Sequence, residues 1–432
     1  MSHRLTRREL LKAAGAGLGL VGGGVALGRL RWTGWLGGEQ AQADGVAGLP
    51  PLAHEAMFYE TVGGESLNCA DCHGEVENHS RALYCHTPHQ GIYVKCRLCP
   101  HACVISEGAR GHCRVRENRG GRLYSLVYGT PCALHLDPIE KKPFYHFLPT
   151  APALSLATAG CNLRCQYCQN WDISQAKPEE VETIDLPPEK LVATAIAQQA
   201  PVLAYTYSEP IIFYEYMLES ARLGREVGLR NVVISAGYIS PGPLEILCEA
   251  VDAIKIDLKG FNDEFYQDVC GGKLAPVLEA IQTIAASGIH LEVVNLVAPT
   301  LNDDMDEMRA MCRWLVESAG PDVPLHFSRF HPNYQLTNLP PTPQATLEQA
   351  WEIAREEGVH YAYVGNLPGH PGNNTFCHHC GDLIIARQGF FVTAYHIVAG
   401  KCEFCGTPIP GVWPGMVAQE DGQSAPWEKT DS

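Results

Sequence analysis

Between residues 153 and 364 the sequence alternates short apolar runs with longer amphipathic stretches, and this alternation limits the fold more than any other feature. The runs predict strands at 153–158, 202–207, 231–236, 253–258, 291–297, 324–330 and 361–364. The stretches between them predict helices near 188–199, 211–227, 242–250, 275–287, 303–318 and 343–357. Strand–helix–strand units of this kind are right-handed and form a parallel sheet. The six or seven units are too few for the eight of a closed barrel, so we expect a partial, open barrel.

Cysteine is the second constraint, because 18 of the 432 residues are cysteine and most of them form close groups. The groups are Cys69 with Cys72; Cys96, Cys99, Cys103 and Cys113; Cys161, Cys165 and Cys168; Cys377 with Cys380; and Cys402 with Cys405. Close pairs suit metal chelation, whereas a disulfide framework is expected in short secreted chains. We therefore predict a Cys/His-rich metal-binding module at 44–148, a strand–helix domain at 149–366 and a zinc-ribbon-like module at 367–415.

Cys161, Cys165 and Cys168 directly follow the first predicted strand, at the edge of a barrel where active-site loops gather. Three thiolates in one short loop hold three irons of a [4Fe–4S] cluster and leave the fourth iron without a protein ligand. An open metal position serves catalysis, whereas a closed tetrad is structural. The loop therefore predicts a catalytic iron–sulfur site, in preference to zinc or disulfides.

With aromatic Tyr167 before its last cysteine, the loop resembles the motif of the radical S-adenosylmethionine (SAM) superfamily. The segments that narrow this resemblance are 137–143 (DPIEKKP), 146–149 (HFLP), 160–162 (GCN) and 168–171 (CQNW). They are similar to the radical enzymes of the AmmeMemoRadiSam system, which are related to pyruvate formate-lyase-activating enzymes. The resemblance covers residues 92–415, which is most of the chain.

This resemblance implies an α/β fold, a partial (β/α)6-type radical SAM barrel with small Cys-rich metal-binding modules at both ends. It implies that a [4Fe–4S] cluster at Cys161, Cys165 and Cys168 reductively cleaves SAM to a 5′-deoxyadenosyl radical. The radical would abstract hydrogen from an unidentified small molecule or protein, as an activase does, and Tyr167 is a candidate for cofactor contact. A low-potential electron donor similar to flavodoxin or ferredoxin is the implied partner.

In the superfamily, a Gly-Gly-Glu segment after the second strand meets the amino group of SAM. Residues 205–210 read YTYSEP here, so the glycines are absent but the carboxylate of Glu209 is kept. Glu209 is a candidate partner of the SAM ammonium group, or else an acidic cap of the following helix. Ser235 and Gly237, after the third strand, are candidates for cofactor contact through the backbone, since glycine permits a close approach.

Later strands supply further candidates. Asp257 and Lys259 alternate on the fourth strand and therefore share one face. They are candidates to bind the cofactor or to form an internal ion pair, and their spacing is compatible with both roles. Asn295, His326 and Arg329, on the fifth and sixth strands, are candidates for cofactor or substrate contact. A lone histidine is more often structural than catalytic.

Cys377, Cys380, Cys402 and Cys405 form two C-x-x-C knuckles, each followed by glycine, with a hairpin predicted between them around Gln388-Gly389. Four such thiolates predict a tetrahedral zinc site, with rubredoxin-like iron or disulfides as alternatives. The sequence also offers a second tetrad, which would bind zinc or an auxiliary cluster: Cys96, Cys99, Cys103 and Cys113.

Cys69-Ala70-Asp71-Cys72-His73 matches the attachment pattern of c-type haem. Haem attachment needs an unfolded chain outside the cytoplasm, and this requirement fits poorly with the twin-arginine route, which exports folded proteins. A third Cys/His metal site is therefore the favoured interpretation, ahead of haem c and of thiols without a metal.

Residues 1–43 resemble a twin-arginine export signal. Arg7 and Arg8 precede an apolar stretch at 13–30, and residues 41–43 (AQA) offer small side chains at cleavage spacing. We expect export by this route, with at most an N-terminal membrane anchor. Cytoplasmic location is the alternative, because SAM and strong reductants are normally cytoplasmic. Residues 416–432 are polar and predict a flexible tail.

The acidic balance excludes one class of partner. Lys and Arg number 32 against 48 Asp and Glu, a net charge of −16, which would repel a nucleic-acid backbone. The leading function is therefore a radical SAM enzyme. The alternative is an exported electron-transfer or metal-handling iron–sulfur protein, which would have no use for an open iron or for Glu209.

Overall fold

The structure is a computed structural model, and it describes residues 48–63 and 91–415. The predicted leader at 1–43, the predicted tail at 416–432 and the pair Cys69 and Cys72 lie outside the described residues. None of the helices in the described part of the chain has the length and apolarity needed to cross a membrane.

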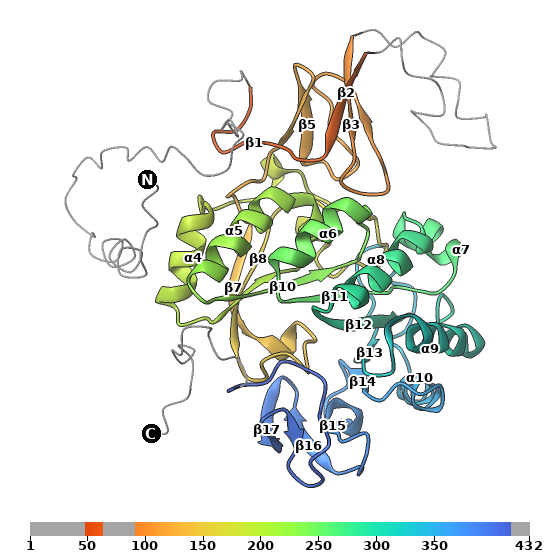
Figure 1. The fold of residues 1–432 in the computed structure, drawn as a ribbon. Helices are drawn as coiled ribbons and strands as arrows, with labels where there is room; N and C mark the ends of the chain where they lie inside the picture. The colour runs from red at the N-terminus through yellow and green to blue at the C-terminus, as the bar shows by residue number, and fades with distance from the viewer. Residues whose placement is uncertain (1–47, 64–90, 416–432) are drawn as a thin grey trace.

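A sheet of eight strands in the order β14-β13-β12-β11-β10-β9-β8-β7 forms the centre of the molecule (Figure 1). Seven of these strands are parallel: β8 (Pro152–Ala157), β9 (Val202–Tyr205), β10 (Arg230–Ser235), β11 (Ala253–Asp257), β12 (His290–Val297), β13 (Leu325–Arg329) and β14 (Ala362–Gly365). In the described residues β7 and β14 remain the two edges. The predicted α/β fold with a partial, open barrel is therefore confirmed.

Helices connect the parallel strands in sequence order. The main ones are α4 (Pro188–Ala197), α5 (Tyr214–Glu226), α6 (Pro241–Ala250), α8 (Leu274–Ser287), α9 (Met305–Ala319) and α10 (Gln344–Glu356). Because successive right-handed crossovers step in one direction, the helices lie on one face of the sheet (Figure 1). The buried residues of α8 repeat at helical spacing and form an apolar stripe against the strands: Leu274, Val277, Ala280, Ile281 and Ile284.

Shorter turns of helix shape the loops between these elements. They are η3 (Ile139–Lys141), α3 (Trp171–Ser174), η4 (Pro178–Glu180), η5 (Pro210–Phe213), α7 (Asp263–Phe265), the π-helix η6 (Tyr266–Cys270) and η7 (Pro371–Asn373). The segment between η3 and β8 fills the base of the inner face of the sheet. Its Phe144 and Phe147 are fully buried in one cluster with Val202, Val232 and Ala253, which lie near the starts of three strands.

The edge strand β7 (Ala133–Pro138) pairs antiparallel with β8. The strand lies within residues 44–148, which the sequence assigns to the Cys/His-rich module, but it belongs to the central sheet. The side chains of His135 and Leu136 are exposed on this edge, so the strand lacks the buried apolar run that marks the inner strands.

The N-terminal module packs on the edge of the sheet where the parallel strands end. It contains two small sheets: β1 (His54–Glu55), β6 (Arg122–Ser125) and β5 (Arg116–Arg119), and β2 (Tyr59–Gly63), β3 (Ile92–Cys96) and β4 (Val104–Ile105). A buried ion pair ties it to α5, because Nη2 of Arg116 donates to both carboxylate oxygens of Glu215 at 2.5–2.6 Å.

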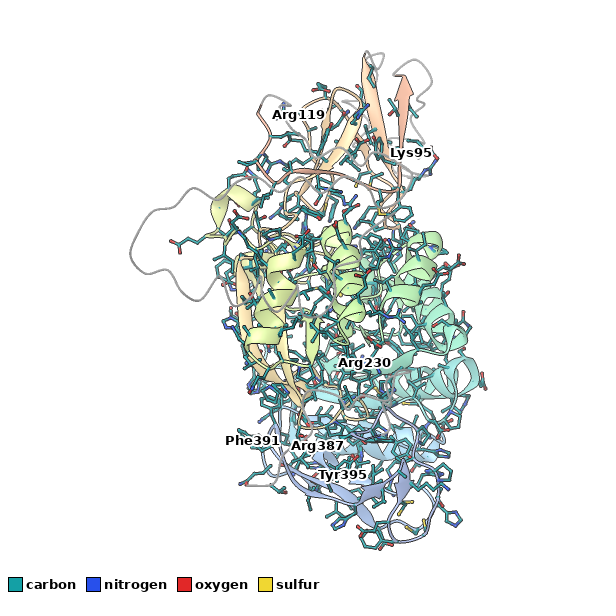
Figure 2. All side chains as sticks on the ribbon, turned by 60° about the vertical axis from the view of Figure 1, so that its left-hand side comes forward. Lys95, Arg119, Arg230, Arg387, Phe391 and Tyr395 are labelled. Atoms are coloured by element: carbon teal, nitrogen blue, oxygen red, sulfur yellow. The ribbon has the colours of Figure 1, made fainter. Side chains whose placement is uncertain are left out.

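The C-terminal module covers the opposite edge, where the parallel strands begin (Figure 1). Its strands are β15 (Thr375–Phe376), β16 (Leu383–Gln388), β17 (Phe391–Tyr395), β18 (Ile397–Val398) and β19 (Lys401–Cys402), so the predicted hairpin is confirmed. Arg387 (Figure 2) stacks on the ring of Tyr145 at 4.0 Å and donates to the Tyr145 carbonyl at 2.9 Å.

Candidate functional site

The three-cysteine loop follows β8 and leads into α3. Its backbone is fixed by bonds to the π-helix, since the N–H of Arg164 donates to the carbonyl of Cys270 at 2.7 Å and that of Gln166 to Val269 at 3.0 Å. Gly160, with φ of 95°, begins the loop, and a Cβ there would lie 2.7 Å from the carbonyl oxygen of Cys113. Glycine is therefore required where the loop meets the N-terminal module.

The thiols of this loop lie in a water-poor environment. Burial raises the pKa of Cys161 and Cys168, and contact with Cys270 together with burial raises the pKa of Cys165. A thiolate is the form that ligates metal. A bound cation is therefore what would hold these three sulfurs in their charged form at neutral pH.

The structure joins three of the predicted cofactor-contact residues, Glu209, Ser235 and Gly237, in one hydrogen-bond network. Oε1 of Glu209 accepts from the Ser235 hydroxyl at 2.7 Å and from the N–H of Ile211 at 3.2 Å, and Oε2 accepts from the N–H of Ala236 at 2.9 Å. The Ser235 oxygen in turn accepts from the N–H of Gly237 at 3.0 Å. Glu209 also caps η5, so the capping interpretation holds alongside any cofactor role.

The carboxylate of Glu209 keeps spare acceptor capacity. A carboxylate offers about four acceptor positions, and the protein donors to Glu209 fill three of them. The residue is 3% exposed, and burial raises its pKa although the bonds from Ser235, Ala236 and Ile211 act against this. A buried carboxylate of this kind is stabilised by a cationic partner.

Asp257 and Lys259 form an ion pair at the end of β11, with 3.5 Å between Nζ and Oδ2. Lys255 contacts the other carboxylate oxygen. Burial would raise the pKa of Asp257, but the two ammonium groups outweigh it and hold the pKa below its usual value. The ion-pair interpretation is therefore seen directly, and the pair lies at the same edge of the sheet as the cysteine loop.

Asn295 and Arg329 lie toward the ends of their strands, and His326 does not. The amide of Asn295 donates to the carbonyl of Leu258 at 2.8 Å, while its buried Oδ1 has no partner. Arg329 donates to the carbonyl of Thr342 at 2.8 Å. His326 lies at the start of β13 and bonds Glu292 at 2.7 Å, so the structure does not bring it to the cysteine loop.

Tyr167 is 4% exposed and packs at 6.2 Å from the ring of Phe265. Its hydroxyl lies 3.6 Å from the sulfur of Cys270. Sequence reasoning missed Cys270, because it stands apart from the other cysteines and carries no motif. The π-helix that ends at Cys270 was missed for the same reason.

A second group that sequence reasoning missed lies between β7 and the loop after β9. Nζ of Lys142 donates to Asp137 at 2.6 Å and to the hydroxyl of Tyr207 at 3.0 Å, and Tyr207 also donates to Asp137 at 2.5 Å. Lys142 is 3% exposed. The amide of Asn170, just after the cysteine loop, donates to the carbonyl of Tyr207 at 2.8 Å, so this polar cluster is linked to the loop.

The C-terminal cysteines form a compact tetrad. The sulfurs of Cys377, Cys380, Cys402 and Cys405 all lie within 4.8 Å of one another. Two sulfur–sulfur distances across the tetrad are 3.7 Å (Cys377 to Cys405) and 3.8 Å (Cys380 to Cys402). This group can bind a metal ion.

Comparison with known proteins agrees with this geometry. Residues 155–315 match the Radical SAM superfamily. The chain is 46% identical over 318 residues to the uncharacterized protein MJ0808 of Methanocaldococcus jannaschii. The aligned region covers 73% of this chain and 95% of that protein. It is 25% identical over 216 residues to the pyruvate formate-lyase 1-activating enzyme of Escherichia coli K12. This second aligned region covers 46% of this chain and 87% of that enzyme.

Among solved structures, a domain of pyruvate-formate lyase-activating enzyme from Bacteroides vulgatus is similar with a TM-score of 0.34 and 14% identity, covering 38% of this chain and 98% of that domain. An open α/β barrel with three cysteines in the loop after its first parallel strand defines a class of iron–sulfur enzyme. The chain belongs to the radical SAM superfamily, and it is homologous to pyruvate formate-lyase-activating enzymes.

Proposed function

We propose that this enzyme abstracts hydrogen from a protein substrate, in the manner of an activase. The observation that carries the radical SAM chemistry in this proposal is the Glu209 network beside the three-cysteine loop. A buried carboxylate with one free acceptor position suits the ammonium group of SAM. An electron-transfer protein would need neither this carboxylate nor a loop with only three cysteines.

The residues present fit the cofactors of the superfamily. Cys161, Cys165 and Cys168 would hold the cluster, and Glu209 would receive the SAM ammonium group. When bound, the reduced cluster and SAM supply a 5′-deoxyadenosyl radical that abstracts hydrogen. The protein's own part is to orient the cofactor and exclude water; the cap on η5 and the bond from Ser235 hold the Glu209 carboxylate in place.

Two polar groups are our candidates for orienting the substrate. One is the buried cluster of Asp137, Lys142 and Tyr207, which Asn170 links to the loop. The other is Asn295, whose buried Oδ1 has no partner. The open edge of the sheet supports a protein segment rather than a small molecule as substrate, because within residues 48–63 and 91–415 no eighth parallel strand closes the barrel.

We further propose that the C-terminal tetrad holds a structural Zn²⁺ ion. A tetrahedral ion with Zn–S bonds of about 2.3 Å separates its sulfurs by about 3.8 Å, and the observed separations are 3.7 and 3.8 Å. The ion would brace the module that packs against the base of the barrel. A low-potential flavodoxin-like or ferredoxin-like donor would supply electrons, and the N-terminal leader would direct export.

Deuterium transfer tests the proposed substrate class. The reconstituted enzyme is incubated anaerobically with SAM, dithionite and extracts of deuterium-labelled host cells, separated by ultrafiltration into protein and small-molecule fractions. We expect deuterium in 5′-deoxyadenosine only with the protein fraction, and none with the Cys161→Ala variant. Transfer from the small-molecule fraction alone would contradict a protein substrate.

A further inference from the structure

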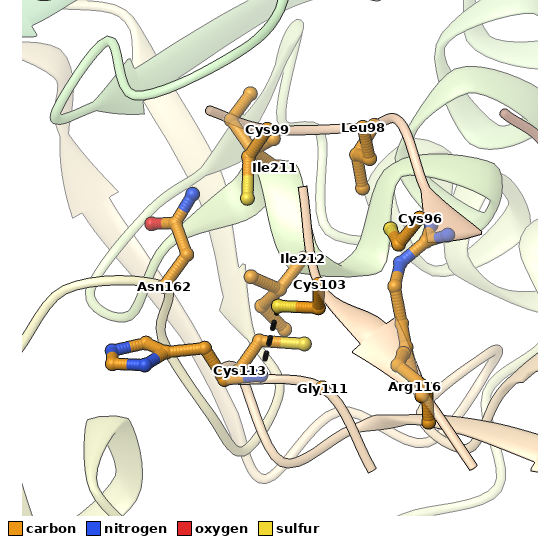
Figure 3. Close-up of a pocket in the computed structure, with 12 residues that line it drawn as sticks. Cys96, Leu98, Cys99, Cys103, Gly111, Cys113, Arg116, Asn162, Ile211 and Ile212 are labelled. Carbon is orange, nitrogen blue, oxygen red and sulfur yellow. Dashed lines mark hydrogen bonds between the residues drawn. The ribbon is translucent and has the colours of Figure 1, made fainter. Parts of the chain in front are cut away.

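A pocket lined by four cysteines lies between the N-terminal module and the barrel (Figure 3). β3 ends at Cys96, Cys99 and Cys103 lie between β3 and β4, and Cys113 lies just before β5. The wall is otherwise largely apolar, and its apolar side chains are Leu98, Ile105, Ile211 and Ile212. Four potential thiolate ligands thus converge on one water-poor space.

The spacing of these sulfurs differs from that of the C-terminal tetrad. In the described residues, the C-terminal tetrad is the one group of three or more metal-ligating side chains with all ligand atoms within 4.8 Å. Figure 3 shows the sulfurs of Cys96, Cys99, Cys103 and Cys113 spread around the pocket. The four cysteines of a cubane bind four different irons, so their sulfurs lie farther apart than on a single ion. The spacing favours a cluster over zinc.

The polar atoms of the wall also indicate an anionic group. Arg116 is 1% exposed, and its Nε and Nη1 have no hydrogen-bond partner, although its Nη2 binds Glu215. Figure 3 shows this guanidinium group beside Cys96. The N–H of His112 donates to the sulfur of Cys103 at 3.3 Å. Unpaired buried donors are rare, and an iron–thiolate cluster carries the negative charge and sulfur acceptors that would pair them.

The pocket shares its walls with the three-cysteine loop. Asn162, which lines the pocket, directly follows Cys161, and its carbonyl oxygen lies 2.6 Å from Nε2 of His101. Ile211 and Ile212, on another wall, belong to η5, the short helix that Glu209 caps. A group bound in the pocket is therefore a direct neighbour of the catalytic loop.

We propose that Cys96, Cys99, Cys103 and Cys113 hold a second [4Fe–4S] cluster, which passes single electrons to the cluster of the neighbouring catalytic loop. All four irons have a cysteine ligand, so no iron is open to substrate, and the cluster gains and loses single electrons. The electrons come from the same low-potential donor. The proposal rests on the proposed function for the presence of a catalytic neighbour, but its metal content is testable alone.

The test uses the full chain with Cys161→Ala, Cys165→Ala and Cys168→Ala together, purified anaerobically and reconstituted with iron and sulfide. We expect about four irons per chain to remain, and an electron paramagnetic resonance signal to appear after reduction with dithionite. Further replacement of Cys99→Ser and Cys103→Ser removes both. The matched control, Cys377→Ser and Cys380→Ser in the same background, keeps the iron.

The unaltered protein gives an independent readout that does not depend on the folding of variants. Its iron content should be about eight per chain. Four irons with two zinc ions per chain, or no iron in the triple variant while its circular dichroism is native, would overturn the second cluster. Absence of SAM cleavage with eight irons bound would instead contradict the proposed function and leave the second cluster supported.

Discussion

The carboxylate of Glu209 accepts a 2.7 Å hydrogen bond from the hydroxyl of Ser235. This bond joins the loop after β9 to the end of β10, and a further bond from Ala236 fixes the second oxygen. Because Glu209 sits at the same sheet edge as Cys161, the pair positions a negative charge beside the cysteine loop. The strand ends, rather than any sequence-local motif, create this arrangement.

Replacing Glu209→Gln should weaken SAM binding about tenfold or more, since hydrogen bonds to charged groups contribute about 1.5–3 kcal/mol. Isothermal titration of SAM into reconstituted protein measures the change. Ser220→Ala removes a buried hydroxyl of α5 that has no partner, and it serves as the control with unaltered affinity. Equal affinities of the Glu209→Gln variant and the unaltered protein would show that Glu209 only caps η5.

Cys380→Ser should abolish zinc binding by the C-terminal module and lower the thermal stability of the protein. The physical reason is that a three-thiolate site loses the closed tetrahedron that makes structural zinc stabilising. Elemental analysis by mass spectrometry and thermal unfolding measure the two effects. Cys132→Ala, a half-buried cysteine outside every group, should leave zinc in place. Zinc retained by Cys380→Ser would refute the assignment.

Acid should destabilise the base of the barrel through His146. Burial lowers the pKa of His146 to about 3, and its ring bonds the carbonyl of Pro410 and the hydroxyl of Tyr363, each at 2.6 Å. The unfolded chain binds this proton near pH 6.5 and the folded one does not. The contribution of neutral His146 to the free energy of unfolding is therefore complete above pH 6.5. It falls by about 2 kcal/mol as the pH is lowered from 7 to 5.

Chemical unfolding of the unaltered protein and of His146→Gln at these two pH values measures this effect. Glutamine offers a donor and an acceptor but does not titrate. The variant should be less stable at pH 7 and lose less stability on acidification. Parallel losses in both proteins would assign the acid sensitivity to other groups.

The export prediction concerns residues outside the described part of the chain. Arg7→Lys together with Arg8→Lys keeps the charge but removes the arginine pair that the export route reads. Cell fractionation should then find the protein retained in the cytoplasm. The same distribution for the variant and the unaltered chain would remove the twin-arginine interpretation.

Much of the barrel was predictable because its inner strands are buried on both faces. The predicted run at 202–207, for example, begins with four apolar residues, and β9 covers these four, Val202–Tyr205, all of them buried. The edge strand β7 was not predictable in this way, since Asp137 is the one fully buried residue among its six. Edge strands carry a weaker pattern, and a Cys/His-rich context hid this one.

A site residue was predictable from the sequence where it lies at the end of a predicted strand. Glu209, Ser235 and Asp257 all lie near the ends of parallel strands, which meet at one edge. The same rule explains why the structure does not bring His326 to the cysteine loop. His326 lies at the start of β13, where it bonds Glu292. Cys270 ends the π-helix and Lys142 follows η3, and only the fold brings Cys270 to Tyr167 and Lys142 to Tyr207.

The most direct test of the account is the production of 5′-deoxyadenosine. Protein reconstituted anaerobically with iron and sulfide is reduced with dithionite in the presence of SAM, and the products are separated by chromatography. We predict 5′-deoxyadenosine from the unaltered protein and from Cys132→Ala, and none from Cys161→Ala. If the unaltered protein and Cys161→Ala both yield no product, or equal amounts, the three-cysteine loop is not a radical SAM site.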